Sequence, residues 1–267
     1  LSDGGGGGAA GKEAAASKAA AAGKAAAGKE AAAGKAAAAG KAAAAGKAAA
    51  PQEAETAAGE PAAGAAVVVP LDGFAVRSET SAYRRYLEIE HRTVAYPDGR
   101  EVSFDIAGHP QNDHAFAVIF AFSTARQTVA CIREFAQAAP PHGALVLGLP
   151  CGGYDRSRHC SMEEAARHEL SEEAGLKGGA WHCLLPPGHA GVLEAKWCRN
   201  RFTPFLVLDP EPDAAPGAQD TEEHIVPTEL PLNRLREAMA AGELLLPSLQ
   251  TCVSALVRLR ALGALRE

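Results

Sequence analysis

Three glutamates, Glu169, Glu172 and Glu173, fall within five residues of the stretch AARHELSEEAGL (165–176). On an α-helix, which turns by about 100° per residue, side chains three and four residues apart are neighbours. Like charges at that spacing repel each other, and burial raises the cost of ionising them unless a cation pairs with them. Mg²⁺ binds carboxylate oxygens and keeps other positions for water and phosphate. The spacing therefore predicts a divalent-cation site; the alternative is an ordinary acidic helix in which Glu173 pairs with Lys177.

The residues around these glutamates predict one helix, from Met162 to Ala174. Ser161 is a favourable N-cap, and Glu164, three residues later, completes a capping box. Gly175 supplies the stop at the C-terminal end, because glycine readily adopts the left-handed conformation found there. The three glutamates are therefore expected on one short helix.

One stripe of this predicted helix is apolar, and two of the three carboxylates border it. At about 100° per residue, Glu169 and Glu173 fall beside the stripe, and Glu172 falls further round the helix. The stripe consists of Ala166, Leu170 and Ala174. Glu169 and Glu173 are therefore expected to point along the edge of the buried surface, where an unpaired charge is costly.

The rest of the globular sequence predicts several strands followed by two helices. Pro97, Asp98 and Gly99 mark a hairpin turn between two alternating runs. Strands and helices do not alternate regularly, so a mixed β-sheet flanked by helices, of the α+β class, fits better than a doubly wound parallel sheet. The strands are expected within 86–108, 116–123, 128–135, 144–150, 179–185, 202–209 and 223–230, and the helices at 232–242 and 247–265.

Composition divides the chain at about residue 66. Residues 1–66 are mostly Ala, Gly, Lys and Glu, whereas residues 67–267 contain every Trp, Tyr and Phe. Lysines that recur about every six residues point in different directions on a helix, so the first segment forms no apolar face. We predict a disordered low-complexity tail at 1–66 and one domain at 67–267. A basic arm for an anionic surface and an organelle transit segment are alternative interpretations of the tail.

Charge and cysteine content limit the expected partners. The net charge is −6 although the tail is basic, so the domain is acidic, which argues against nucleic acid. Six cysteines without a CxxC pair indicate reduced thiols in an intracellular protein, with the cytoplasm favoured and a plastid or mitochondrion as alternatives. No run of about 20 apolar residues is present, so no membrane partner is expected. Monomer and homodimer both stay open.

The segments GLPCGG (148–153) and EEAARHELSEEAGL (163–176) together resemble the Nudix box. Gly152 matches the opening glycine of that motif, and six later positions match in register: Glu169, Leu170, Glu172, Glu173, Gly175 and Leu176. The family's arginine position holds His168, with Arg167 beside it, and the family's first glutamate position falls on Cys160. The resemblance covers about residues 83–265 and implies the Nudix fold, an α/β/α sandwich.

The resemblance also implies a metal-dependent hydrolase. Mg²⁺ or Mn²⁺ would neutralise a diphosphate and activate water. The implied ligands are Glu169, Glu172, Glu173 and the backbone carbonyl of Cys151, with Glu172 and Glu173 at the catalytic centre. Glu222 or Glu223, in the acidic loop DTEEHI (220–225), would be the general base, with a solvated acidic loop as the alternative. Gly152 and Gly153 would let the backbone approach phosphate.

Several other residues are candidates for contacts with the substrate or for support of the site. The strand CIREF (131–135) resembles the basic strand of enzymes that act on ADP-ribose or nucleoside-diphosphate sugars, which implicates Arg133. Arg199 and Arg201 flank an asparagine and suit phosphate contacts, with plain surface charge as the alternative. Trp181 and Trp197 would stack on a base or pack in the core. His168 is interpreted as a substitute for the family's supporting arginine, with Arg167 next to it.

The expected function is hydrolysis of the diphosphate linkage in a nucleoside diphosphate joined to another moiety, of the ADP-ribose or NDP-sugar type. The expected partner is thus a small nucleotide substrate. The alternative is an inactive Nudix-fold module that binds a nucleotide or a protein. The changes at Cys160 and His168 favour this alternative, whereas the three retained glutamates favour the enzyme.

Overall fold

The computed structural model describes residues 72–219 and 223–266. The tail predicted at 1–66 lies outside this part of the chain. The described residues form three α-helices and a short 3₁₀ turn, η1. Their bounds are α1 (Met162–Ala174), α2 (Leu232–Ala241), α3 (Leu246–Ala261) and η1 (Pro110–Asn112). Among these helices, none is both long and apolar enough to cross a membrane.

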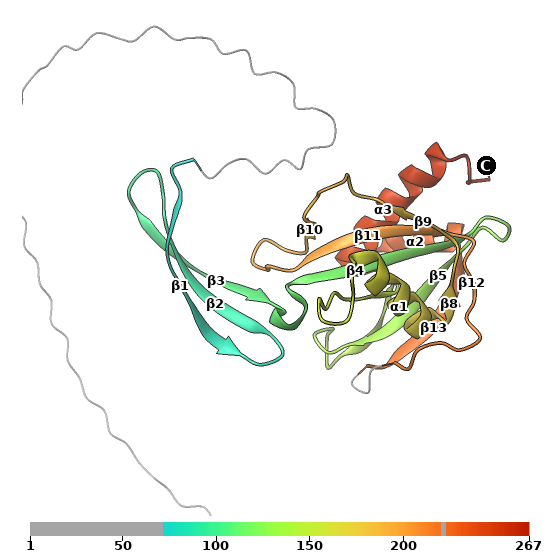
Figure 1. Cartoon of the computed structure of the whole chain (residues 1–267), viewed down its shortest axis with the longest axis horizontal. Helices are drawn as coiled ribbons and strands as arrows, with labels where there is room; N and C mark the ends of the chain where they lie inside the picture. Colours follow the sequence, from blue (N-terminus) through green and yellow to red (C-terminus); the bar gives the residue numbers. More distant parts are fainter. Residues whose placement is uncertain (1–71, 220–222, 267) are drawn as a thin grey trace, which may run out of the picture. The chain divides into compact units, whose positions relative to one another are not determined.

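An eight-stranded mixed sheet forms the centre of the described domain (Figure 1). Its strands are β4 (Ala115–Ser123), β5 (Thr128–Ala136), β6 (Ala144–Gly148), β7 (Cys151–Gly153), β9 (Ala180–Cys183), β10 (Val192–Leu193), β11 (Arg201–Leu208) and β13 (Ile225–Pro231). The strand order is β10-β11-β4-β5-β13, with β6 beside β5, β7 beside β4 and β9 beside β11. β4 and β11 are parallel, whereas β5 pairs antiparallel with both β4 and β13. The predicted mixed sheet is confirmed.

Each face of β4 has its own core, because successive side chains of a strand point to opposite faces. The face toward α2 and α3 is lined by Val118, Phe120 and Phe122, and the face toward α1 by Ala117, Ile119 and Ala121. Burying each large apolar side chain stabilises the fold by roughly 1.5–3 kcal/mol. In Figure 1, α1 lies in front of the sheet and α3 behind it. This arrangement confirms the α/β/α sandwich.

A second, three-stranded antiparallel sheet precedes the central one in the chain. It contains β1 (Ala75–Arg84), β2 (Glu88–Ala95) and β3 (Glu101–Gly108). The hairpin predicted at residues 97–99 is confirmed, since it joins β2 to β3. Nothing in the sequence analysis predicted β1, because most of its residues are small or polar and every one of them is exposed, Val76 and Tyr83 included. A strand without a buried face leaves no hydrophobic pattern to recognise.

Two small elements tie the end of α1 to the chain after β11. Lys177 and Leu176 form β8 (Leu176–Lys177), which pairs with β12 (Glu211–Pro212). Further on, the helix predicted at 247–265 ends at Ala261. Gly263 has a φ of 66°, and a residue in that left-handed region ends a helix.

Candidate active site

The sequence at both ends of α1 sets the position of its glutamates. The Ser161 side chain accepts a hydrogen bond from the Glu164 N–H at 3.1 Å, and Gly175 adopts the left-handed conformation. These signals confirm the predicted helix bounds. The Glu164 carboxylate accepts from the Cys160 N–H at 2.6 Å, one residue before the partner that a capping box would use. Cys160, at the family's first glutamate position, is thus anchored by Glu164.

Glu173 is the most unusual carboxylate of the helix. It is only 3 % exposed, and its Oε2 accepts a hydrogen bond from the Cys151 N–H at 2.7 Å. Burial, together with the negative charge of Glu169, raises the pKa of Glu173 to about 9, and the Cys151 hydrogen bond opposes this rise. A carboxylate at this position is ionised at neutral pH only if positive charge reaches it.

Glu169 lies directly against β7, next to Cys151. A Cβ atom added to Gly152 would sit 2.0 Å from the Glu169 carboxyl carbon, so only glycine leaves room for this carboxylate. The next glycine is similarly covered, since a Cβ on Gly153 would lie 2.8 Å from Nδ2 of Asn112. Asn112 was not predicted, because it precedes Gly153 by 41 residues and belongs to the connector before β4. Two predicted site residues, Glu169 and Gly152, are therefore in contact.

The Glu172 side chain points toward Gly217 and not toward β7. A Cβ atom added to Gly217 would lie 2.3 Å from the Glu172 Cγ and 2.7 Å from its Oε1. Gly217 belongs to the segment that follows β12, whereas Glu169 and Glu173 face β7. The structure therefore separates Glu172 from the other two glutamates of the predicted ligand set.

The acidic loop before β13 is described only in part. Glu222 lies outside the described residues. Glu223 is exposed, and its negative charge adds to the rise in the pKa of both Glu173 and the Cys151 thiol. Glu223 is therefore placed within electrostatic reach of the Glu173 carboxylate.

Strand β5 contributes a carboxylate that the sequence analysis missed. Ala130 belongs to the core under α1 and Cys131 to the opposite core, so alternation places Glu134 on the α1 face and Arg133 on the other. Glu134 is half-buried, and burial raises its pKa. The alternation of side chains along CIREF is the signal that could have identified Glu134, because a strand places Glu134 and Arg133 on opposite faces. Arg133 thus lies on the face away from the α1 glutamates.

These groups can be tested for their fit to Mg²⁺ or Mn²⁺. Glu169, Glu173 and the Cys151 backbone offer oxygen donors of the kind these ions prefer. Within residues 72–219 and 223–266, no group of three or more His, Cys, Asp or Glu side chains could hold a metal ion. Mg²⁺ is commonly held by one or two carboxylates, with water and substrate phosphate completing its shell. The two glutamates fit that mode of binding.

Comparison with known proteins gives the fold. No family model matches the sequence, and no curated protein matches it either. The solved structure of an ADP compounds hydrolase matches with a TM-score of 0.55 and 17 % identity, over 73 % of this chain and 98 % of that chain. The fold is the Nudix fold.

Two further solved structures match with lower TM-scores. The NUDIX domain of NrtR from Shewanella oneidensis, complexed with ADP ribose, has a TM-score of 0.40 and 19 % identity, over 54 % of this chain and 87 % of that chain. A MutT structure from work on Aliivibrio salmonicida and Vibrio cholerae has a TM-score of 0.32 and 15 % identity, over 46 % of this chain and 83 % of that chain.

The residues at the arginine position of the Nudix box have partners of their own. The His168 ring lies edge-on to His159, with centroids 5.2 Å apart. Arg167 donates to Glu163 at 2.7 Å, and its guanidinium carbon lies 4.5 Å from the centre of the Trp181 ring. None of these three contacts involves a glutamate of the candidate site.

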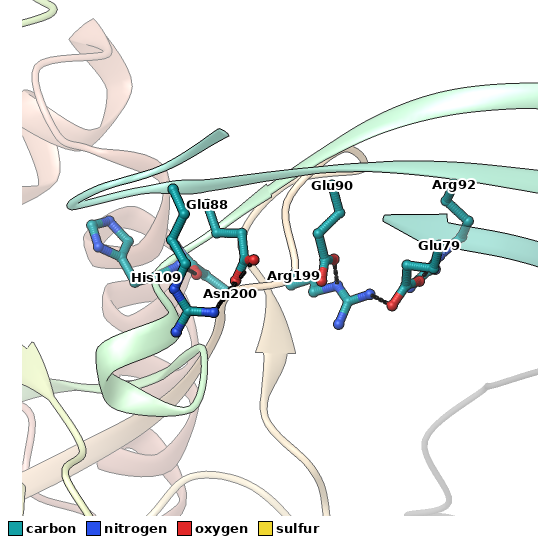
Figure 2. Close-up of polar contacts among 8 residues, drawn as sticks. Glu79, Glu88, Glu90, Arg92, His109, Arg199 and Asn200 are labelled. Atoms are coloured by element: carbon teal, nitrogen blue, oxygen red, sulfur yellow. Dashed lines mark hydrogen bonds and ion pairs between the residues drawn. The ribbon is translucent and has the colours of Figure 1, made fainter. Parts of the chain in front are cut away.

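The structure places Arg199 between two carboxylates of the three-stranded sheet (Figure 2). Its Nε lies 2.5 Å from Glu90 and its Nη2 lies 2.5 Å from Glu79. Beside it, the buried Asn200 accepts a hydrogen bond from the His109 N–H at 2.9 Å. Arg199 therefore links the three-stranded sheet to the start of β11.

Arg201 differs from Arg199 in its surroundings. It is exposed at the start of β11, and it shares strand parity with Phe205 and Val207, which pack under α1. Arg201 thus lies on the same face of the central eight-stranded sheet as the glutamates of α1.

The two tryptophans have different environments. Trp181 packs edge-on against Phe205 at 5.9 Å and donates to the Gly178 carbonyl at 2.8 Å, as a core residue does. Trp197 is 66 % exposed, so the expectation that it packs in the core is wrong. The Trp197 carbonyl accepts a hydrogen bond from the Ala107 N–H of β3 at 2.9 Å, and the Arg199 N–H donates to the Ala107 carbonyl at 2.8 Å. These bonds hold the backbone at 197–199 against β3, while the Trp197 ring stays exposed.

Proposed function

We propose that this protein hydrolyses the diphosphate linkage of a nucleoside diphosphate joined to another moiety, of the ADP-ribose or NDP-sugar type, with Mg²⁺ or Mn²⁺ as cofactor. The observation that carries the proposal is the contact of Glu173 and Glu169 with Cys151 and Gly152 of β7. A buried carboxyl whose pKa is about 9 sits beside a second carboxylate, and this arrangement suits an added cation.

Each group of the site has a proposed role. Glu169, Glu173 and the Cys151 carbonyl would hold the cation, which when bound neutralises diphosphate charge and acidifies water. Arg201 would contact a substrate phosphate from the same face of the sheet. Glu223 would accept a proton from water as the water oxygen bonds to one phosphorus. The bridging P–O bond then breaks, releasing a nucleoside monophosphate and a second phosphorylated product.

The proposal is tested by metal-dependent release of monophosphate from the full-length chain. The substrate panel would contain ADP-ribose, ADP- and UDP-sugars and dinucleotides, each with Mg²⁺, with Mn²⁺ and with a chelator. Glu173→Gln is the test variant, and Glu163→Gln on the same helix is its control, because Glu163 pairs with Arg167 instead. Turnover that needs the metal and is lost only in Glu173→Gln supports the enzyme.

An inactive nucleotide-binding module is the second candidate. It is favoured by His168, which contacts His159 and makes no described contact with the glutamates it would support. Saturable binding of ADP-ribose without turnover of any compound in the panel would establish the module and end the hydrolase proposal.

We also propose that the chain forms a homodimer through its three-stranded sheet. Neither hydrophobic core of the described domain includes a side chain of β1, β2 or β3, and all ten residues of β1 are exposed. Isolated sheets of this size need a covered face to be stable. Sedimentation equilibrium of the parent and of Phe104→Asp, on β3, would show a dimer in the first and a monomer in the second.

A further inference from the structure

Helix α3 carries apolar side chains on two faces, of which only one is buried. The buried face packs against the central sheet on the side away from α1, through Ala255 and Leu259 among others. On the other face, Leu246, Val253 and Val257 fall within about 40° of one another around the helix axis. Their exposed fractions are 68 %, 51 % and 68 %. Exposed apolar side chains that lie together mark a binding surface, whereas single scattered ones need no explanation.

Two hollows border this exposed stripe. The first, of about 440 Å³, lies between α2 and α3, and its lining includes Leu256 and Leu265. The second, of about 600 Å³, lies between α3 and residues 183–186, at the end of β9. Val253 and Val257 line both hollows, so they form the ridge between them. We call the ridge and its two hollows the α3 groove.

The charge of the α3 groove differs from that of the whole chain. Its lining contains Arg236, Arg258 and Arg260 and no aspartate or glutamate, although the chain has a net charge of −6. Within residues 72–219 and 223–266, none of the three arginines forms an ion pair. Arg236 and Arg260 line the same hollow, where two like charges repel each other until a negative charge joins them.

We propose that the α3 groove binds an acidic amphipathic helix of a partner protein. A helix that docks in a groove presents apolar side chains at positions i, i+4 and i+7 as anchors. Laid along α3, these anchors would enter the hollow beside Val253 and Val257. Carboxylates that flank the anchors would pair with Arg236 and Arg260 on one side of the ridge and with Arg258 on the other. Because the groove lies on the side of the sheet away from the α1 glutamates, the inference is independent of the proposed hydrolase function.

Two other occupants lack part of what the groove requires. A second copy of this chain, docked about a two-fold axis through the groove, would bring arginines against the same arginines. Residues 1–50 carry seven lysines against three acidic residues and contain no large apolar residue after Leu1. Residues 51–70 contain three glutamates, but Pro61 separates them from the valines at 67–69. An acidic amphipathic helix supplies both the anchors and the opposite charge.

The test measures peptide binding to the full-length protein by fluorescence anisotropy. The probe is a labelled acidic peptide of about 18 residues, five helical turns, with Leu at i, i+4, i+7 and i+11 and Glu beside them. Its basic twin has Lys in place of every Glu. A scrambled acidic peptide keeps the composition and loses the apolar stripe.

Two variants of the protein change the groove, and two controls change other surfaces. Val257→Asp places a charge on the ridge, and a triple variant replaces all three groove arginines by Glu. Each of these side chains is exposed, so the folded structure should persist. The controls are Leu193→Asp, at a residue that is 60 % exposed on β10, and Arg85→Glu, at an exposed arginine, because neither residue lines the groove.

The parent should bind the acidic peptide saturably, and at least about 10-fold more tightly than the basic twin or the scrambled peptide. Val257→Asp should weaken binding by about 10-fold or more, because it puts a charge where an apolar anchor packs. The triple variant should prefer the basic twin, since the charge of the groove has changed sign. Both controls should match the parent.

Four results would overturn the proposal. The first is no saturable binding of the acidic peptide by the parent, and the second is equal affinity for the acidic peptide and its basic twin. Binding of the parent to vesicles of phosphatidylserine and phosphatidylcholine, lost in Val257→Asp and without any peptide binding, would assign the groove to a membrane surface. A parent dimer that Val257→Asp converts to a monomer in sedimentation equilibrium would assign it to a second copy of the chain.

Discussion

Two clusters of charged side chains in this protein are built in opposite ways. At Arg199, one guanidinium lies 2.5 Å from both Glu79 and Glu90, and this contact is the main reason that the pKa of Glu79 is lowered. At Glu173, burial and the negative charge of Glu169 raise the pKa to about 9. The first cluster is balanced within the chain, because Arg92 Nε also lies 2.5 Å from Glu79, whereas the second gathers charge of one sign.

The difference shows why residue type alone does not identify a phosphate contact. Arg199 and Arg201 stand two positions apart and were expected to share a role, but the first is engaged by the three-stranded sheet and the second is exposed on the α1 face. A balanced cluster suits a structural role, and an unbalanced buried one suits a ligand of opposite charge. Substitutions in each cluster should therefore differ in what they change.

The largest effect is expected for Glu173→Gln. Hydrolysis should fall by about 100-fold or more, because the variant loses the carboxylate best placed to attract a cation. The stability of the metal-free protein, by contrast, should be higher in Glu173→Gln than in the parent at alkaline pH. The folded protein keeps the Glu173 proton up to a pKa of about 9, whereas the unfolded chain releases it near 4.5, so stability falls as pH rises between these values.

Melting temperatures without metal would check this sign. Glu173→Gln has no proton to lose, so at pH 8 it should melt above the parent, and the gap should shrink toward pH 5. If the parent instead gains stability relative to the variant as the pH rises, the Glu173 carboxylate is already stabilised by positive charge in the folded protein.

A smaller but clear loss is expected for Gly152→Ala. The new Cβ would overlap the Glu169 carboxylate, which must move away from β7, and activity should fall by about 10- to 100-fold. Gly148→Ala is the matched control on the neighbouring strand, since its Cβ would lie 3.5 Å from Ser248, an ordinary contact. Equal kcat values for the two variants would show that Glu169 takes no part in the reaction.

The sequence was sufficient where the physical signal is local. Ser161 and Gly175 bracket α1 because capping acts on the nearest backbone groups, and the 3.6-residue period places Glu173 against the core. Six strands of the central sheet were predicted from apolar runs, whereas β7 and β10 were not, because they are only three and two residues long. β1 was not, because a strand exposed on both faces has no such run.

The sequence was insufficient where contacts join distant segments. The contacts of Arg199 with Glu79 and Glu90 span more than one hundred residues, and no pattern near Arg199 indicates them. The same holds for Gly217 against Glu172, which depends on the return of the chain after β12. Glu134 could have been placed from strand alternation, provided that the face occupied by α1 was known.

Arg199→Ala should change stability and leave the chemistry alone. The substitution leaves the mostly buried Glu90 without its cation, while Glu79 keeps Arg92 at 2.5 Å. The free energy of unfolding should drop by about 1–3 kcal/mol. Urea unfolding would measure the drop, with Arg236→Ala as the control, since Arg236 forms no ion pair within the described residues. A large rise in KM with unchanged stability would instead show that Arg199 contacts the substrate.

The smallest effect should separate Arg201 from Arg133. Arg201 shares the sheet face of the glutamates, so Arg201→Ala should raise KM by roughly five-fold, which corresponds to the loss of about 1 kcal/mol, the usual contribution of one hydrogen bond. Arg133 lies on the opposite face, and Arg133→Ala should leave KM close to the parent's value. Steady-state kinetics on the best substrate would measure both, and a reversed order would mean that the substrate lies on the other face.

Direct binding of Mn²⁺ tests the central claim, that the carboxylates around Glu173 take a divalent cation. Free Mn²⁺ would be measured by electron paramagnetic resonance during titration of the full-length parent, Glu173→Gln and Glu163→Gln. The account predicts that the parent and Glu163→Gln bind alike and that Glu173→Gln binds at least about 10-fold more weakly. Equal Mn²⁺ affinity of the parent and Glu173→Gln would contradict it.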